Sequence, residues 1–204
     1  MTLGTYIKKR NFKETQEPKA GKSPEKGHLK FVVQRHQASH LHYDFRLEME
    51  GVLKSWAVPK GPSMNPNDRR LAMMVEDHPY NYRTFEGVIP KGNYGAGIVE
   101  IWDEGTYDFI EEGSRKEEEK ALLKGLHEGN LKFIMHGDKL KGEFALVRMN
   151  GTADNAWLLI KKKDRHAVYK AYSSEDLVDK DSKIVKKPQK ALKKKPLLMV
   201  SLLN

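Results

Sequence analysis

A group of residues able to bind a metal ion lies early in the chain, where three histidines and one aspartate fall within nine residues: His36, His40, His42 and Asp44. The segment LHYDFRLEM alternates strictly between apolar and polar residues, which is typical of a β-strand. His42 and Asp44 therefore project from the same face at a step of about 7 Å. Imidazole nitrogen and carboxylate oxygen are both good ligands for Mn²⁺ or Zn²⁺. His36 is expected in the turn before the strand, from where it can supply a third ligand. The alternative is an ordinary solvated polar face.

The next polar residue on that face, Arg46, cannot bind a metal, but its guanidinium group can hold an anion bound to one. The opposite face is uniformly apolar and must be buried, so we expect the polar face to be open to solvent or to a cavity. The place of His40 stays open. It shares the face of His42 if the strand begins early, and it lies in the turn if the strand begins late.

A second group of residues that could take part in catalysis is Glu76-Asp77-His78-Pro79, at the end of another predicted strand. It places an acid and an imidazole at the rim of a sheet, although an ordinary polar strand exit explains these residues equally simply. The stretch Gly92-Asn93-Tyr94-Gly95-Ala96-Gly97 does not match a dinucleotide-binding loop and precedes no helix, so it predicts tight turns beside the site. No Ser/His/Asp arrangement for nucleophilic catalysis is indicated.

The elements that must position these groups are mostly strands. Strand-like runs follow one another closely over residues 30–34, 41–49, 52–59, 71–77, 98–110 (with a turn near Glu104-Gly105), 131–137, 142–149 and 156–162. One segment, 114–129, predicts a helix, with Ser114 and Glu117 as a capping box and Gly125 or Gly129 as its end. Many short strands with one helix predict a mainly β fold with few helices, a compact antiparallel β-barrel-like single domain.

Composition and charge narrow the function. The chain has 204 residues, no cysteine and a net charge of +9. Without cysteine, disulfides, thiolate zinc sites and a cysteine nucleophile are excluded. No stretch approaches the roughly 18–20 apolar residues of a membrane helix, and the N-terminus lacks the apolar run of a secretory signal, so we expect a cytoplasmic protein with no membrane partner. Residues 1–30 carry +5 and residues 161–204 carry +8, around a middle part of −4. Basic ends of this kind favour contacts with nucleic acid, the alternative being solubility alone.

Two longer stretches, QRHQASHLHYDFRLEMEGVLKSWAVPKGPS and RRLAMMVEDHPYNYRTFEGVIPKGNYGAGIVEIWDEGTY, resemble the 3′-phosphoesterase module of bacterial DNA ligase D, which also occurs as a stand-alone protein in archaea and some bacteria. The resemblance extends from about Tyr6 to about Lys163. It divides the chain into three parts: residues 1–30, a basic N-terminal arm that belongs to the functional unit; residues 31–163, the phosphoesterase β-barrel domain; and residues 164–204, a Lys-rich C-terminal tail without a family role.

The resemblance implies a Mn²⁺-dependent hydrolase that heals DNA 3′ ends, with Co²⁺ or Zn²⁺ as other candidate metals. Such enzymes remove a 3′-terminal ribonucleoside from a primer strand, which leaves a 3′-phosphate, and then hydrolyse that phosphate to a 3′-OH for repair by non-homologous end joining. The expected substrate is a DNA primer–template with a 3′-ribonucleotide or a 3′-phosphate. Separate ligase, primase–polymerase and Ku proteins are the expected partners of a monomeric enzyme.

Carried over by motif, the metal ligands are His36, His42 and Asp44. The residues expected around the scissile phosphate are Arg46, Arg70, His78 and Tyr82. The residues expected to bind substrate are Arg10 and Glu17, chiefly in the phosphodiesterase step, together with His40, Lys60 and Glu76. His40 departs from the family, because some members carry arginine there. The departure leaves the phosphate contacts at this position open and makes His40 a candidate for an additional weak metal ligand.

Two other classes of function are kept as alternatives. One is a non-catalytic nucleic-acid-binding β domain with a structural metal, against which the outward polar face of the HLHYDFR strand argues, because protein ligands normally enclose a structural ion. The other is a hydrolase of small phosphorylated metabolites, against which the basic ends argue. Cleavage of a primer–template that ends in one ribonucleotide distinguishes the three.

Overall fold

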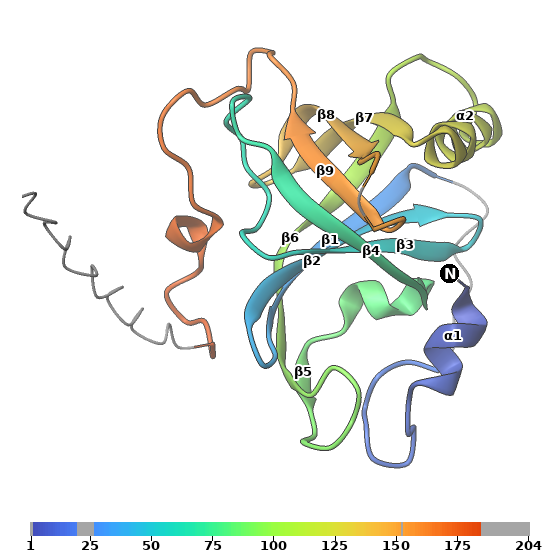
Figure 1. The fold of residues 1–204 in the computed structure, drawn as a ribbon, viewed down its shortest axis with the longest axis vertical. Helices are drawn as coiled ribbons and strands as arrows, with labels where there is room; N and C mark the ends of the chain where they lie inside the picture. Colours follow the sequence, from blue (N-terminus) through green and yellow to red (C-terminus); the bar gives the residue numbers. More distant parts are fainter. Residues whose placement is uncertain (1, 20–26, 152, 185–204) are drawn as a thin grey trace, which may run out of the picture.

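A computed structural model of the chain describes residues 2–19, 27–151 and 153–184 (Figure 1). These ranges contain the α-helices α1 (Leu3–Lys8) and α2 (Arg115–Glu128) and the short 3-10 helices η1 (Tyr80–Thr84) and η2 (Ser174–Leu177). The strands are β1 (Leu29–Gln37), β2 (Leu41–Met49), β3 (Val52–Val58), β4 (Arg70–Pro79), β5 (Gly87–Ile89), β6 (Gly97–Phe109), β7 (Asn130–Gly137), β8 (Lys141–Arg148) and β9 (Ala156–Lys161). No helix in the described ranges is long and apolar enough to cross a membrane.

Eight of these strands form a closed antiparallel barrel in the order β1, β2, β3, β4, β9, β8, β7, β6, and the pairing of β6 with β1 completes the ring. The predicted mainly β, barrel-like single domain is confirmed. The predicted turn near Glu104-Gly105 is wrong, because β6 is continuous and pairs first with β5 and β1 and then with β7. Gly105 serves close packing instead, since a Cβ there would lie 2.3 Å from the carbonyl oxygen of His136.

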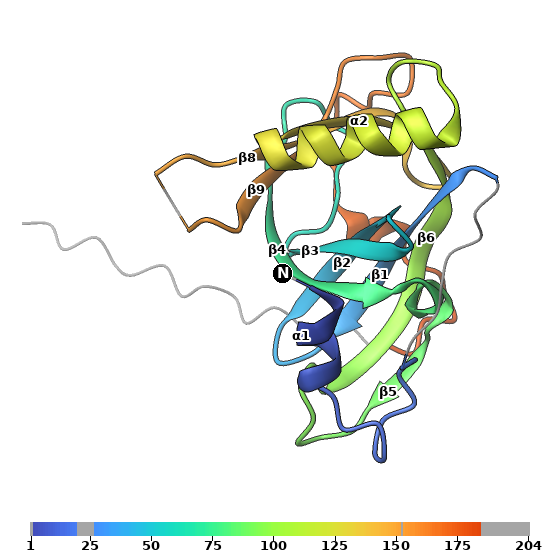
Figure 2. The same ribbon diagram turned by 90° about the vertical axis from the view of Figure 1, so that its right-hand side faces the viewer.

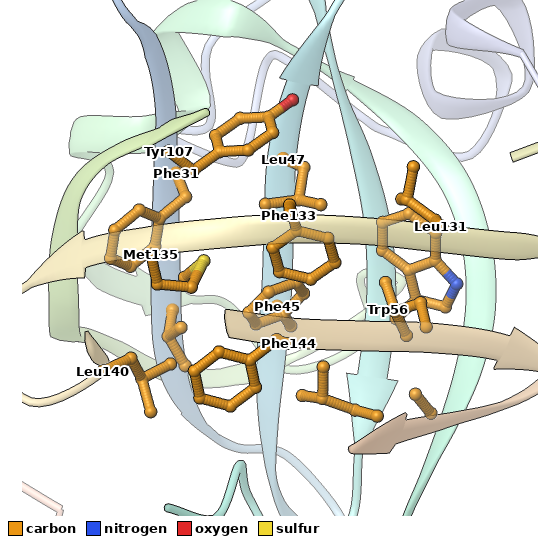
Figure 3. Packing of buried hydrophobic residues seen from close by; sticks show 14 of the residues in the cluster. Phe31, Phe45, Leu47, Trp56, Tyr107, Leu131, Phe133, Met135, Leu140 and Phe144 are labelled. Carbon is orange, nitrogen blue, oxygen red and sulfur yellow. The ribbon is translucent and has the colours of Figure 1, made fainter. Parts of the chain in front are cut away.

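The barrel interior is filled by the apolar face of the alternating strands. On β2, Phe45 and Leu47 are fully buried in this core, as the alternation predicts. The ring of Phe45 lies 6.0 Å from that of Phe133 on β7, so opposite walls of the barrel meet at the centre (Figure 3). Burying each large apolar side chain contributes about 1.5–3 kcal/mol to stability. This core therefore fixes strand β2, whose outer face carries Asp44 and Arg46.

The outer face of β1–β4 is also covered, which decides between the two environments, solvent or a cavity, that were expected for the polar face. Helix α1 and strand β5 lie on one side of this part of the sheet, and β7–β9 lie on the other (Figures 1 and 2). A second apolar cluster packs beneath the cover and consists of Tyr6, Leu53, Tyr82, Phe85, Ile89 and Val99. Asp44 and Arg46 are consequently only 8% and 2% exposed. The polar face opens to a cavity and not to bulk solvent.

Two local predictions are confirmed. Glu50 and Gly51 join β2 to β3 in a two-residue turn, and both have positive φ angles, 51° and 75°, as the favoured hairpin turns require. Ser114 and Glu117 form the capping box of α2, and Gly129, at φ 79°, ends it in the left-handed conformation. A further α-helix, α1, lies within residues 1–30, for which only a basic N-terminal arm was predicted.

Part of the sequence beyond Lys163 is attached to the barrel. The buried guanidinium group of Arg35 on β1 pairs with Glu175 at 2.8 Å and with Glu100 at 2.9 Å, and it also donates to the carbonyl of Ile184 at 3.1 Å. The indole of Trp102 donates to the carbonyl of Ser174 at 3.0 Å. The Lys-rich end, residues 185–204, lies outside the described residues, so its expected contact with DNA stays a prediction, as do the boundaries of the three parts.

Candidate active site

A cavity of about 210 Å³ lies on the outer face of the barrel wall. It is lined by Arg10, His36, Ala38, His42, Asp44, Arg46, Ala57, Val75, Glu76, His78, Tyr82, Ile89, Tyr94 and Gly95. Eight residues that the sequence singled out therefore share one space. A larger cavity of about 280 Å³ lies between β5–β6 and residues 178–183, but its described lining offers no histidine. Because histidine, aspartate and arginine side chains line it, the smaller cavity is the candidate active site.

The predicted metal ligands meet at one point of this cavity. His36 and His42 face each other across the β1–β2 ladder, with ring centroids 4.7 Å apart. Asp44 lies 3.4 Å from Nδ1 of His36 and 3.5 Å from Nε2 of His42, and one ligand atom from each of the three residues falls within 4.8 Å of the others. His36 belongs to β1, so strand pairing brings it to the site, and the expectation that it lies in a turn is wrong.

The remaining imidazole nitrogens are held by backbone carbonyls. Nε2 of His36 donates to the carbonyl of Gly95 at 2.9 Å, and Nδ1 of His42 donates to the carbonyl of His40 at 3.0 Å. These bonds turn the other nitrogen of each ring toward Asp44, where a metal ion that displaces any proton on it can bind. A carbonyl behind the ring is the arrangement that orients metal-binding histidines in proteins. Two nitrogens and one carboxylate oxygen suit a divalent transition metal. The donor set of this cavity therefore fits such an ion.

Electrostatics keep the carboxylate of Asp44 ionised. Burial alone would raise the pKa of Asp44, but the positive charge of Arg46 and hydrogen bonds from the two imidazoles hold it well below its usual range. For His42, burial would lower the pKa, while the hydrogen bond and the charge of Asp44 raise it. A cation thus finds a charged carboxylate ready to bind it.

Arg46 supplies a fixed hydrogen-bond donor beside the three ligands. Its Nε donates to the side-chain oxygen of Gln34 at 2.8 Å, and its Nη2 donates to Asp44 at 3.0 Å. The guanidinium carbon lies 4.9 Å from the centre of the Tyr82 ring. Its Nη1 is buried and has no hydrogen-bond partner among the residues that the structure describes. A buried donor without a partner is costly, so this position is suited to an incoming anion.

His78 and Tyr82 complete the wall opposite the metal ligands. Nδ1 of His78 donates to the carbonyl of Glu76 at 2.9 Å, and its Nε2 faces Nη2 of Arg10 at 3.4 Å. Burial and the charges of Arg46 and Arg10 hold the pKa of His78 well below its usual value, so the ring is neutral at pH 7. Burial raises the pKa of Tyr82 well above its usual value, so its hydroxyl stays protonated and donates to Glu17 at 3.0 Å.

The N-terminal arm reaches this wall through Arg10. Its guanidinium group binds Glu17 through Nε at 3.1 Å and Glu76 through Nη1 at 2.9 Å. Lys9 adds a second cation on Glu76 at 3.1 Å. Burial would raise the pKa of Glu76, but these hydrogen bonds lower it. Glu17 does not line the cavity, but it binds Arg10 and Tyr82, which do.

Three predicted site residues lie elsewhere. Arg70 begins β4, where it binds Asp68 at 2.8 Å and the carbonyl of Tyr172 at 2.9 Å. It precedes Glu76 by six strand positions, or about 20 Å at the usual rise per residue. Lys60 and the side chain of His40 are exposed and do not line the cavity. Only the backbone carbonyl of His40 takes part, through His42.

Several residues that line or support the cavity were not predicted from the sequence. Tyr94 and Gly95 line the cavity from the glycine-rich loop, where only turns beside the site were predicted. Gln34 fixes Arg46 by accepting its Nε–H, and its own amide donates to two backbone carbonyls. Tyr6 packs at 5.0 Å from the ring of His78. The polar face of β1, on which Gln34 and His36 alternate, was the available signal for Gln34; α1 gave none for Tyr6.

The depressed pKa of His78 predicts a pH dependence of stability. Below about pH 6.5 the unfolded chain protonates this histidine and the folded chain does not, so the folded state is destabilised as the pH falls. The loss approaches about 1.4 kcal/mol for each pH unit below that value. Urea unfolding of the metal-free protein and of His78→Gln at several pH values between 5 and 7.5 measures this effect.

The control for this prediction is the difference between the two proteins. His42, whose raised pKa acts in the opposite direction, is present in both and cancels. The variant is expected to lose less stability in acid than the parent. Identical acid dependence in the two proteins would show that His78 titrates normally when folded.

The sequence of this chain matches known proteins over the part that carries most of the cavity. Residues 34–148 match a family model described as the DNA ligase D 3′-phosphoesterase domain. The chain is 47% identical over 169 residues to the multifunctional non-homologous end joining protein LigD of Pseudomonas aeruginosa, covering 81% of this chain and 19% of that protein. It is 43% identical over 164 residues to the LigD proteins of Mycobacterium tuberculosis and Mycolicibacterium smegmatis, covering 80% of this chain. The chain spans about a fifth of the length of these relatives.

Proposed function

Because this chain belongs to the family of DNA ligase D 3′-phosphoesterase domains, we propose that it is a Mn²⁺-dependent enzyme of DNA 3′ ends. It removes a 3′-terminal ribonucleoside as a phosphodiesterase and a 3′-phosphate as a phosphomonoesterase, and it leaves a 3′-OH. The observation that carries this proposal is the position of the three metal-ligating residues beside Arg46, whose buried Nη1 lacks a partner. A cation site and an anion donor in one cavity suit a phosphate ester.

In this proposal, the cavity residues divide the work on the phosphate. His36, His42 and Asp44 would hold the metal, which when bound would polarise a phosphoryl oxygen and lower the pKa of the attacking hydroxyl or water. Arg46 donates Nη1–H to a phosphate oxygen and neutralises the charge that develops there. His78 carries a lone pair on Nε2, which faces Nη2 of Arg10 at 3.4 Å, so it enters the reaction as a hydrogen-bond acceptor or, once Arg10 turns to the substrate, as a base. Tyr82 holds Glu17 and packs against Arg46.

The substrate is a DNA primer–template, and the context is double-strand break repair. The relatives are named as multifunctional non-homologous end joining proteins, which supports action together with ligase, primase–polymerase and Ku functions. A monomeric state and a place in the cytoplasm remain predictions from the sequence. Arg70 and Lys60 do not line the cavity, so in this proposal they are placed to contact only DNA that extends past it.

The direct test is a cleavage assay. The protein is incubated with Mn²⁺ and a 5′-labelled primer–template that ends in one ribonucleotide. We expect a product shortened by one nucleoside that carries a 3′-phosphate, followed by its conversion to a 3′-OH end. A parallel reaction with chelator should show neither product. No shortening and no loss of 3′-phosphate in Mn²⁺, Co²⁺ or Zn²⁺ would contradict the proposal.

Arg10 and Glu17 are expected to separate the two reactions. The ribonucleoside substrate extends further from the metal than a 3′-phosphate does, and the N-terminal arm lines the cavity through Arg10, which Glu17 holds at 3.1 Å. A hydrogen bond to a charged group contributes about 1.5–3 kcal/mol. Arg10→Ala and Glu17→Gln should therefore slow ribonucleoside removal roughly ten- to a hundredfold and 3′-phosphate removal much less. Steady-state kcat/KM on the two substrates measures the split. Equal losses on both would count against it.

A further inference from the structure

One aromatic side chain of the cavity differs from the others in its exposure. Tyr94 lines the same space as the metal ligands but is 50% exposed, whereas Tyr82 is 2% exposed. A half-exposed aromatic ring at a cavity contributes less to folding than a buried one, because half of its surface still faces water. It offers a flat surface to a ligand instead.

The loop that carries Tyr94 is fixed from three sides. Within the loop, Asn93 donates its backbone N–H to the carbonyl of Pro90 at 3.2 Å, and Ala96 donates to Asn93 at 3.1 Å. The side chain of Asn93 also donates to Glu14 of the N-terminal arm at 3.1 Å. Gly95 accepts the hydrogen bond from the metal-ligand candidate His36 at 2.9 Å. Tyr94 is therefore placed one residue from a group that orients the metal site.

Two cations lie against the ring. Nζ of Lys9 lies 4.4 Å from its centroid and donates to its hydroxyl at 3.2 Å, and the guanidinium carbon of Arg10 lies 5.0 Å from the centroid. An aromatic ring beside cations is the combination that binds nucleotides, because the base stacks on the ring and the cations attract the backbone phosphate.

We propose that Tyr94 forms a subsite for the nucleobase of the 3′-terminal nucleoside, the group that leaves in the phosphodiesterase step. This inference rests on the proposed function. The scissile phosphate must reach His36, His42, Asp44 and Arg46 inside the cavity, so the nucleoside attached to it lies toward the open side, where the half-exposed Tyr94 stands. A 3′-phosphate has no such nucleoside. Tyr94 thus matters for one reaction and not for the other, and it acts on any base because every base has a π-face.

The kinetic test uses three substrates: a primer with a 3′-terminal ribonucleotide, the same primer with an abasic terminal ribose, and a primer with a 3′-phosphate. The parent protein should prefer the base-bearing end to the abasic end by about tenfold in kcat/KM. Tyr94→Ala should remove this preference, Tyr94→Phe should keep it, and 3′-phosphate removal should stay within about twofold of the parent in both. Tyr169→Ala, at an exposed tyrosine outside the cavity, is the matched control.

A binding measurement separates failure of the subsite from failure of the proposed function. A primer–template with a 3′-terminal 2-aminopurine ribonucleotide, titrated with protein in the presence of chelator, should lose fluorescence on binding to the parent and to Tyr94→Phe but much less on binding to Tyr94→Ala. Quenching without Mn²⁺-dependent cleavage overturns the proposed function and retains a base subsite. Cleavage by a parent that does not distinguish base-bearing from abasic ends overturns the subsite. Equal losses on ribonucleoside and 3′-phosphate ends in Tyr94→Ala also overturn it, because they would mean that the ring only supports the loop behind His36.

Discussion

Replacing any one of His36, His42 and Asp44 should lower both the ribonucleoside-removing and the 3′-phosphate-removing activity by at least about a hundredfold. Even residues that only orient metal ligands typically cost ten- to a hundredfold when changed, and in the proposed function these three side chains supply the ligand atoms themselves. His36→Ala, His42→Ala and Asp44→Asn are the variants to test. Mn²⁺ affinity, measured by calorimetry, should fall in parallel with kcat/KM on both substrates.

The structure changes what these variants should do to the fold. A solvent-facing strand predicts that all three are harmless to stability, but Asp44 is buried against Arg46 at 3.0 Å. Removing one partner of a buried ion pair costs about 3–5 kcal/mol, so Asp44→Ala should be strongly destabilised. Asp44→Asn keeps an oxygen that can accept from Arg46 and is the cleaner variant. Thermal melts identify any loss of activity that merely follows unfolding.

The matched control is His127→Ala, an exposed histidine on α2. It should keep both activities and Mn²⁺ affinity. A variant of the three ligands that stays folded and retains near-normal activity in Mn²⁺ would show that the metal is held elsewhere.

Strand β2, which carries two of the three proposed metal ligands, was predictable because its alternation is strict. The apolar positions of β2 enter the barrel core and the polar positions face the cavity, so His42, Asp44 and Arg46 share one face in the structure as in the sequence. The pairing that brings His36 opposite His42 depends on the register of β1 with β2. A pattern within one strand does not contain that register, so the sequence placed His36 in the turn.

The covering layer was the least predictable part. Helix α1 is only six residues long and buries Tyr6 against residues more than seventy positions away. Short helices of this kind are stabilised by tertiary contacts and not by their own propensity. Arg70 was misplaced for a different reason. It belongs to the same sequence motif as Glu76 and His78, which line the cavity, but it begins strand β4 and therefore lies far from them.

Arg46→Lys should lower kcat on both substrates by roughly a hundred- to a thousandfold, the usual cost of losing one donor to the charge that develops in a transition state. The guanidinium group holds Gln34 and Asp44 with two of its nitrogens and still presents Nη1 to the cavity. An ammonium group is a single point and cannot keep both anchors while reaching a phosphate oxygen, although it preserves the charge. Arg83→Lys, at an exposed ion pair on η1, is the control and should remain active. If Arg46→Lys matched the parent on ribonucleoside and 3′-phosphate ends while binding Mn²⁺ normally, charge alone would suffice at this position, and the unpartnered Nη1 would have no role in holding the phosphate.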